Sequence, residues 1–318
     1  MQNTVKDVKV IKYLVRLKRD KNYRLKLFKD RKTYGNVFYV IGIFMATEQA
    51  TSLFHHQWIK YFQTSYTFLG LLFFGIIFSL YLQRPVDSRS EKLEGTDIDI
   101  EICVGDFFSL ESTYVIPVNS SFEFERFAKK LNTGEKTSLI RALVEKHFSD
   151  VSELNNQVQK QLSKLSPAEE ANMQHAAEVK KYPAGTVVRV DWESEAKSNG
   201  AYLVATTYLN EYGKSRTNIE YTQQALAGLW ADVSAKGSPN AIAIPLIGGG
   251  HGSLTETREA IVETIIHSFV VAVRREKRKL TKKLYVVISP DDHDRNPVDM
   301  IHLGHYLSFV CSHSQSFH

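Results

Sequence analysis

The sequence predicts an α/β fold, an α/β/α sandwich with a mixed, mostly parallel sheet, preceded by an N-terminal transmembrane helical hairpin. Strand-like runs alternate with helical patterns after residue 97, and several runs are apolar throughout, as in parallel strands covered on both faces. Two long apolar segments come before them. These observations divide the chain into a basic arm at 1–35, a hairpin at 36–83, a linker at 84–96 and a folded domain at 97–318.

The first 35 residues form the basic arm. They hold twelve Lys and Arg against three Asp, so the arm carries a formal charge of +9 in a chain of net charge +5, and the remainder is acidic at −4. The main domain is therefore not expected to bind nucleic acid. RNA binding or a merely solvated helix would also suit the arm, but the adjacent apolar segment favours anionic membrane lipids as its partner.

Residues 37–54 and 66–82 are the two apolar segments of the hairpin. The first has 18 residues with one formal charge and the second has 17 with none, close to the lower limit of about 17 residues for a membrane-crossing helix. Because the positive arm is expected to stay in the cytoplasm, two crossings return the domain at 97–318 to the same side. The alternative is a buried helical hairpin in a soluble core.

The second half of the first segment is polar and contains Glu48 and Gln49. An ionisable group inside a membrane span is costly unless it faces a partner or water. These two residues are therefore candidates for a subunit interface or a pore in an assembly of several copies. Glu48 could instead lie close enough to the outer interface to reach water.

Six strands and several helices are expected after the linker. A polar, turn-rich composition indicates that residues 84–96 are the linker, and helical patterns occupy much of 123–181, a region with no role assigned from sequence. The expected strands are 98–104, 114–118, 185–190, 201–208, 240–246 and 284–289, and two further helices are expected at 218–234 and 254–277.

Three polar or glycine-rich turns follow expected strands, where ligands of parallel sheets bind. Asp106 follows Gly105 at the end of one strand, Asn119, Ser120 and Ser121 follow another, and Gly248, Gly249, Gly250, His251 and Gly252 follow a third. Successive glycines allow backbone N–H groups to surround an anion, and the next helix adds its positive end. A plain tight turn, a helix cap at Asp106 and a self-bonded turn at Asn119 are the structural alternatives.

In this order the three turns resemble those of the macro domain, a module that binds ADP-ribose. Val104-Gly105-Asp106-Phe107 resembles its Gly-Asp-Ile element, which implies that Asp106 accepts from the adenine amino group. The segment 117–122 (PVNSSF) resembles a degenerate form of its Val-Asn-Ala-Ala-Asn segment, and residues 245–252 (PLIGGGHG) resemble its diphosphate loop. The resemblance implies an ADP-ribose derivative as the ligand of Asp106, Phe107, Asn119–Ser121 and Gly248–Gly252.

One departure from this pattern bears on catalysis. Phe122 stands where hydrolytic macro domains carry a second Asn, which favours binding without turnover. No catalytic residue, metal cluster or cofactor is expected, because the chain shows no Ser-His-Asp order, no acid pair and only two cysteines, without metal-ligand spacing. His251 could donate to a phosphate or could simply be solvated.

The fusion of a membrane hairpin to such a domain resembles the membrane-anchored effector of type II Thoeris, a bacterial antiphage system. The resemblance implies that a partner TIR-domain enzyme makes histidine-linked ADP-ribose, which the macro domain binds as a second messenger. The effector would then form a homo-oligomer and disrupt the bacterial inner membrane, killing the infected cell by abortive infection. A membrane-tethered ADP-ribosyl hydrolase and a passive membrane scaffold are the two alternatives. The sequence does not indicate how many subunits the assembly has, or whether it forms a pore or ruptures the membrane more generally.

Overall fold

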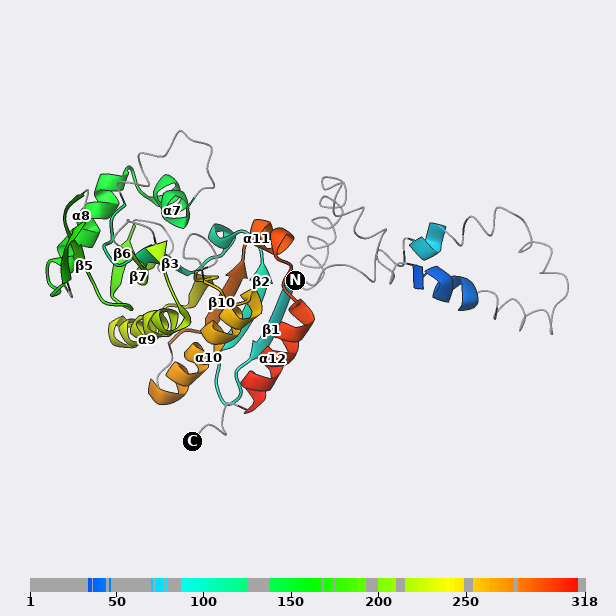
Figure 1. Cartoon of the computed structure of the whole chain (residues 1–318). Coiled ribbons are helices and arrows are strands. Elements are labelled where there is room, and N and C mark those ends of the chain that lie inside the picture. Colours follow the sequence, from blue (N-terminus) through cyan, green and yellow to red (C-terminus); the bar gives the residue numbers. More distant parts are fainter. Residues whose placement is uncertain are drawn as a thin grey trace. The chain divides into compact units, whose positions relative to one another are not determined.

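The computed structural model divides the chain into two units, Met1–Pro85 and Val86–His318 (Figure 1). It describes residues 34–35, 37–43, 46, 70, 73–76, 78, 87–124, 138–167, 169–173, 176–192, 200–209, 215–248, 254–276 and 280–313. Residues 37–43 and 73–76 of the first unit are helical. No helix within the described ranges is long and apolar enough to span a membrane. Most of the expected spans, together with Glu48 and Gln49, lies outside those ranges.

The second unit contains one mixed sheet with the strand order β1-β2-β10-β9-β3-β7-β6, and β8 pairs with β7. Strands β2, β10, β9, β3 and β7 are parallel, whereas β1, β6 and β8 are antiparallel to their neighbours. The strands are β1 (Ser88–Lys92), β2 (Asp99–Val104), β3 (Thr113–Asn119), β6 (Val187–Asp191), β7 (Gly200–Leu209), β8 (Ser215–Arg216), β9 (Ala241–Pro245) and β10 (Lys283–Ile288). A separate hairpin consists of β4 (Glu169–Met173) and β5 (Ala176–Lys181).

Helices cover both faces of this sheet (Figure 1). The aliphatic face, which includes Ile100, Ile102 and Val286, packs under α9 (Ile219–Lys236), α10 (Arg258–Glu276) and α12 (Met300–His313). The other face packs under α7 (Leu139–His147), α8 (Val151–Leu162) and the short η1 (Phe107–Ser109). A last short helix, α11 (Pro290–Arg295), follows β10. Because the side chains of a strand point alternately to the two faces of the sheet, each apolar strand contributes residues to the hydrophobic core on both faces.

The six expected strands are confirmed, each within two residues of its expected ends. Two expectations are wrong. The segment 84–96 is not a linker throughout, because it contains β1, and residues 169–173 and 176–181 form the paired strands β4 and β5 instead of a helix. The sequence of β1, SRSEK, is polar because β1 lies at the sheet edge with much of its surface exposed. Its pairing with β2, which no local pattern reveals, makes it a strand.

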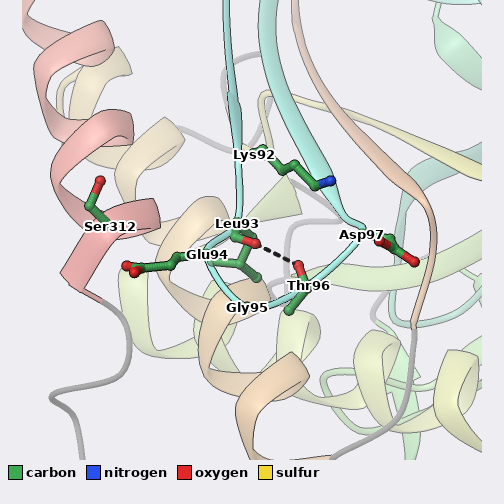
Figure 2. Close-up of a pocket in the computed structure, with 7 residues that line it drawn as sticks. All are labelled: Lys92, Leu93, Glu94, Gly95, Thr96, Asp97 and Ser312. Atoms are coloured by element: carbon green, nitrogen blue, oxygen red, sulfur yellow. Dashed lines mark hydrogen bonds between the residues drawn. The ribbon is translucent and has the colours of Figure 1, made fainter.

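An open hollow of about 750 Å³ lies beside the turn that joins β1 to β2 (Figure 2). The turn is a closed hairpin, in which Thr96 Oγ1 donates to the Leu93 carbonyl at 2.8 Å. Because β2 begins at Asp99, this hollow is at the amino end of the parallel strands. It is therefore at the opposite edge of the sheet from the three predicted ligand-binding turns.

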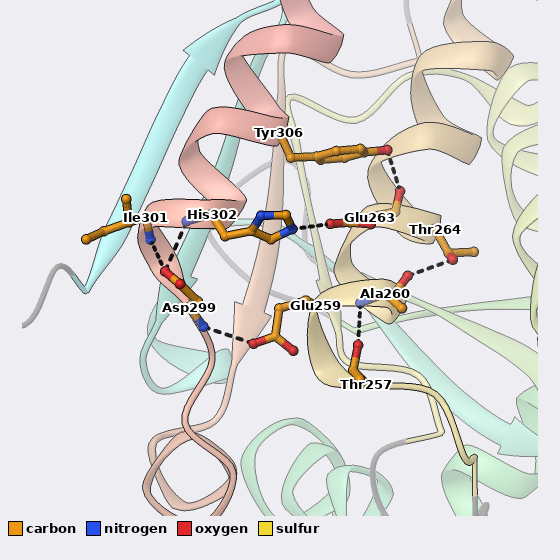
Figure 3. Close-up of polar contacts among 9 residues, drawn as sticks. All are labelled: Thr257, Glu259, Ala260, Glu263, Thr264, Asp299, Ile301, His302 and Tyr306. Atoms are coloured by element: carbon orange, nitrogen blue, oxygen red, sulfur yellow. Dashed lines mark hydrogen bonds and ion pairs between the residues drawn. The ribbon is translucent and has the colours of Figure 1, made fainter.

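Polar contacts hold the last helix, α12, against α10 (Figure 3). His302 Nε2 lies 2.9 Å from Glu263 Oε1, and the Tyr306 hydroxyl donates to the Glu263 carbonyl at 3.3 Å. At the start of α12, the Asp299 N–H donates to Glu259 Oε1 at 2.9 Å. The helix that follows the glycine-rich loop is thereby fixed to the C-terminal helix as well as to the sheet.

Candidate functional site

The carboxyl ends of five parallel strands lie at one edge of the sheet, where Asp106 follows β2, Asn119 ends β3 and Gly248 follows β9. β3 and β9 are neighbours in the sheet. After β3 the chain continues to strands on the β7 side of the sheet, and after β9 it continues to β10 on the opposite side. The topological switch point therefore lies between β3 and β9. Their pairing covers only Thr113 with Ile242 and Tyr114 with Ala243. Beyond these residues β3 and β9 are not paired with each other, and Pro117 and Pro245 there lack an N–H group to donate. Ligands of open α/β sheets bind at such a point.

Asp106 follows β2 and is exposed. Its Oδ1 accepts from the Phe108 N–H at 3.1 Å, so it caps η1. Among the described residues, Oδ2 has no hydrogen-bond partner. A Cβ at the preceding Gly105 would meet nothing within 4 Å, so there is open space beside this turn. The carboxylate is thus positioned by one oxygen and has the other available for a donor such as an exocyclic amine.

The side chain of Phe107 is not available to a ligand. It is 6% exposed and packs edge-on against Phe108, with ring centroids 5.1 Å apart, and against Tyr114 at 5.3 Å. Burial raises the pKa of Tyr114, and the negative charge of Asp106 raises it further. Of the predicted binding residue Phe107, only the backbone can reach a ligand.

Asn119, Ser120 and Ser121 form a turn closed by the Asn119 side chain. Asn119 Oδ1 accepts from the Ser121 N–H at 3.1 Å and from Ser121 Oγ at 2.8 Å. The Ser120 N–H donates to the Thr207 carbonyl at 2.7 Å, which ties the turn to β7. Both serines are buried. Within the described residues the Asn119 amide NH₂ has no partner, so it is the group of this turn that remains to donate to a ligand.

Phe122 follows this turn with a left-handed backbone, φ 52°. Its ring is fully buried and packs edge-on against Tyr182, with the ring centroids 5.9 Å apart. A phenylalanine in the left-handed region is strained, and here the buried ring offsets that strain. The position therefore offers an incoming ligand neither a polar group nor an exposed apolar ring.

Gly248 makes the turn after β9 with φ +78°. A Cβ here would lie 3.1 Å from Leu254 Cβ and 3.2 Å from Thr217 Cγ2. Both the backbone conformation and the close neighbours thus require glycine at this position. Gly249, Gly250, His251 and Gly252, the rest of the predicted loop, lie outside the described residues.

An ion pair joins the start of α10, after β9, to α11, after β10. Arg258, at the start of α10, places Nε 3.0 Å from Asp292 Oδ2, and both side chains are about one-fifth exposed. Asp292 also donates its N–H to Ser289 Oγ, the cap of α11, at 3.2 Å. The segments that follow β9 and β10 are therefore fixed to each other at the carboxyl edge. Sequence reasoning did not single out this pair, which comes from two distant segments.

Neither metal nor thiol chemistry is apparent in the described part of the chain. No group of three or more His, Cys, Asp or Glu there could hold a metal ion. Burial raises the pKa of Cys103 and of Cys311 to about 12, and both thiols are free. A thiol with so high a pKa is a poor nucleophile near neutral pH.

The strand order, the helices on both faces and the polar turns at the switch point define a macro domain. The chain belongs to the family described as Thoeris protein ThsA, Macro domain, whose model matches residues 100–289. No curated protein matches the chain.

Solved structures that the chain resembles include two of the Oceanobacillus iheyensis macrodomain. The one described as the macrodomain with ADP has 12% identity and a TM-score of 0.44, and covers 71% of this chain and 97% of its own. A mutant of the same macrodomain has 12% identity and a TM-score of 0.42, and covers 71% of this chain and 94% of its own.

Proposed function

We propose that this protein is a membrane-anchored antiphage effector of a Thoeris system, whose macro domain binds a messenger derived from ADP-ribose. The observation that carries the proposal is the convergence of Asp106, Asn119 and Gly248 along one edge, around a switch point where β3 and β9 pair only near their first residues and then separate. Each offers a different interaction: a carboxylate oxygen and an amide NH₂ that have no partner among the described residues, and a left-handed turn before a helix. A nucleotide with an adenine, a ribose and a diphosphate needs all three.

The assignment of ligand parts follows from these groups. The Asp106 carboxylate accepts from the adenine amino group, and Asn119 donates to a ribose hydroxyl. The turn at Gly248 begins the loop that receives the diphosphate, where a left-handed glycine turns backbone N–H groups towards an anion. The messenger is histidine-linked ADP-ribose, produced by a TIR-domain enzyme when infection is sensed.

The proposed activity is binding without hydrolysis. Macro-domain hydrolysis requires polar groups beside the distal ribose, and Phe122 contributes a fully buried ring at the corresponding position. The protein then acts by changing its assembly state. A ligand shifts such an equilibrium only by binding the assembled state more tightly, by about 5 kcal/mol for a nearly complete switch.

The membrane assignment is supported by the exposure pattern of the first unit. Phe38 and Phe73 are 71% and 65% exposed, whereas Gly75 is buried. A Cβ at Gly75 would lie 3.5 Å from Val37 Cγ1 and 3.7 Å from Val37 Cα, so the two helical segments approach closely at this glycine. Small residues at the contact and large apolar side chains outside are typical of helices packed in lipid. We place the hairpin in the bacterial inner membrane, with the arm and the macro domain in the cytoplasm.

Calorimetry of the full-length protein in detergent tests this function, with ADP-ribose and its histidine conjugate as ligands. Asp106→Asn is the sharpest variant, because it keeps the oxygen that caps η1 and replaces the free acceptor by a donor. We expect about a tenfold or greater loss of affinity for both ligands, as for a lost hydrogen bond to a charged group.

Sizing of the same sample should show a larger complex when the conjugate is added. If the complex has the same size with and without saturating histidine conjugate, the effector function is contradicted. If the wild-type protein does not bind the conjugate, the proposed identity of the messenger is contradicted. Release of free ADP-ribose from the conjugate would support a hydrolase instead.

A further inference from the structure

Strand β1 ends the sheet on one side, and within the described residues it pairs with β2 alone (Figure 1). Val104 donates its N–H to the Asp87 carbonyl at 2.7 Å, which sets the hydrogen-bond pattern of the β1–β2 ladder. Because bonded positions alternate along an antiparallel strand, Arg89 and Glu91 bond to β2, whereas the N–H and C=O of Ser90 point to the open side. The outer side of β1 is therefore a template on which another strand can pair.

The sequence of β1, SRSEK, is complementary to itself in an antiparallel pair. With a two-fold axis at Ser90, Arg89 of each copy lies directly opposite Glu91 of the other copy, so two pairs of opposite charge form. An axis at position 89 or 91 would instead place two arginines or two glutamates opposite each other, which is unfavourable. Charged residues often prevent an edge strand from pairing, but these charges repel only in the shifted registers. They therefore favour a second copy of this chain, in one register.

Both charged side chains of this pair can reach a second copy. Glu91 is exposed, and its carboxylate has no hydrogen bond or ion pair within the described residues. Arg89 is partly exposed and passes beneath α12, where its Nε donates to the Met300 carbonyl at 3.3 Å. A Cβ at Gly304 of α12 would lie 3.1 Å from Arg89 Cδ, so this glycine allows the close passage. The Met300 carbonyl uses one of the five N–H groups of the guanidinium, and others remain for a carboxylate.

The helix beside β1 fits the same contact. α12 has no Lys, Arg, Asp or Glu among its 14 residues, although these types make up 24% of the chain. Ile301, Gly304 and Ser308 lie at helical spacing along one side of α12, and Gly304 places that side next to β1. Ile301 is 58% exposed, and Ser308 is also exposed. Antiparallel pairing of two β1 strands would bring two α12 helices alongside each other, so an uncharged side with small residues would be covered.

We propose that β1 pairs with β1 of a second copy around a two-fold axis at Ser90, with the two α12 helices alongside, and that this contact joins subunits of the assembly. Each strand contributes only five residues, so the contact is weak between freely diffusing copies. Copies anchored in one membrane meet at a higher effective concentration. The two Ser88 residues would be roughly 14 Å apart, which brings the chain ends leading to the two hairpins together. The inference rests on the proposed function for its role and names the surface that the assembly uses.

Cysteine cross-linking of the full-length protein in unfractionated lysates of expressing cells tests the pairing. Ser90→Cys places two thiols at the axis with Cα atoms about 5.5 Å apart, within the range of a disulfide. We expect a covalent dimer after mild oxidation with copper phenanthroline, with or without added histidine conjugate. Ser152→Cys is the matched control, because Ser152 is an exposed serine of α8, on the other face of the sheet. The native thiols give little background, since burial raises the pKa of Cys103 and of Cys311 to about 12.

Charge exchange in the Ser90→Cys chain separates a contact between copies from a contact within one chain. Arg89→Glu should reduce the yield of covalent dimer about fivefold, because two pairs of like charge replace two pairs of opposite charge. Adding Glu91→Arg to the same chain should restore the yield, although the bond to the Met300 carbonyl stays lost. A substitution that only disturbed the packing of α12 on β1 would not be rescued in this way.

The outcomes separate this inference from the proposed function. If Ser90→Cys gives no more covalent dimer than Ser152→Cys, with and without the conjugate, pairing through β1 is refuted, while conjugate binding by calorimetry still supports the messenger site. If the exchanged chain is not rescued, the register with its axis at Ser90 is refuted. If Ser90→Cys cross-links and the exchanged chain is rescued, but the wild type does not bind the conjugate, the surface stands and the proposed function fails.

Discussion

The two units of this chain use the same apolar residue types in opposite ways. In the first, Phe38 and Phe73 are exposed while Gly75 is buried against Val37. In the second, Phe122 and Phe269 are both fully buried. A unit that folds in water must bury its large apolar side chains, whereas one that packs in lipid can expose them and needs small residues where its helices meet. This difference is the one expected if the first unit lies in lipid, as proposed, and the second folds in water.

The largest expected effect comes from breaking the interior of the second unit. A Cβ at Gly228 of α9 would clash with the Gly185 carbonyl oxygen, and Gly185 itself has φ +77°. Alanine is favoured over glycine in a helix by about 1 kcal/mol, so destabilisation would come from this backbone clash alone. For Gly228→Ala we expect a net loss of about 3 kcal/mol or more in the free energy of unfolding.

Thermal unfolding of the full-length protein in detergent, followed by circular dichroism, measures this loss. Gly105→Ala is the matched control, because a Cβ there meets nothing within 4 Å. Equal melting temperatures for the two variants would mean that α9 and the Gly185 turn do not approach as closely as the structure shows.

The second prediction concerns the contact within the first unit. Leucine at Gly75 would separate the two helical segments at Val37, at a cost of about 1–3 kcal/mol for overpacking. We expect Gly75→Leu to reduce membrane permeabilisation in expressing cells while messenger affinity of the purified protein is unchanged. Gly70→Leu is the control, since nothing lies within 4 Å of a Cβ there. If both variants permeabilise membranes like the wild type, this glycine contact is not part of the active assembly.

The sequence predicts the buried strands well and the edge of the sheet poorly. The run at 240–246 could be identified as a strand because it is apolar throughout, which is the requirement for β9 between two neighbours. Strand β1 could not be identified in this way. It pairs with β2 alone and is largely exposed to solvent, so its sequence, SRSEK, does not need to be apolar. The β4–β5 hairpin shows no alternation of apolar and polar residues that would separate it from the helices before it.

The site could be predicted where a turn carries its own chemistry. Asp106 and Gly248 lie in the turns after β2 and β9, and Asn119 ends β3, so a local pattern is enough to mark them as candidates. The burial of Phe107 depends on Tyr114, which lies in the next strand, and no local signal shows it. The Arg258–Asp292 ion pair was missed because its two residues, far apart in sequence, meet only in the folded domain.

The third prediction is a smaller effect at the ligand-binding edge. Alanine at Gly248 would have to adopt φ +78° and crowd Leu254 and Thr217. A left-handed conformation costs about 1–2 kcal/mol for a residue with a Cβ, so part of the loop should relax away from its binding geometry. We expect about a tenfold loss of messenger affinity by calorimetry.

Gly237→Ala is the control for this variant. Gly237 has φ +108°, but a Cβ there meets nothing within 4 Å, and it ends α9 away from the three turns. The control therefore introduces backbone strain without disturbing the loop, and it should bind the messenger like the wild type. The same loss of affinity in both variants would show that the effect is general destabilisation.

The smallest expected effect is a pH dependence that originates in the second unit. The His147 ring stacks on Trp192 with centroids 4.2 Å apart, and the rings of Phe108 and Tyr114 lie within 6.5 Å. Burial lowers the pKa of His147 from 6.5, and the positive charge of Lys146 lowers it further. The unfolded chain therefore takes up a proton at a higher pH than the folded domain does. Stability is complete above about pH 6.5 and falls as the pH drops towards the lowered pKa.

Melting temperatures at about pH 7.5 and about pH 5.5 test this dependence. We expect His147→Phe, which keeps an aromatic ring against Trp192, to lose less stability on acidification than the wild type, by roughly 1–2 °C. His305→Phe alters a histidine on the exposed side of α12 and should behave like the wild type. If His147→Phe shows the full wild-type dependence on pH, the acid sensitivity of the second unit lies in other groups, and the His147–Trp192 stack contributes to packing alone.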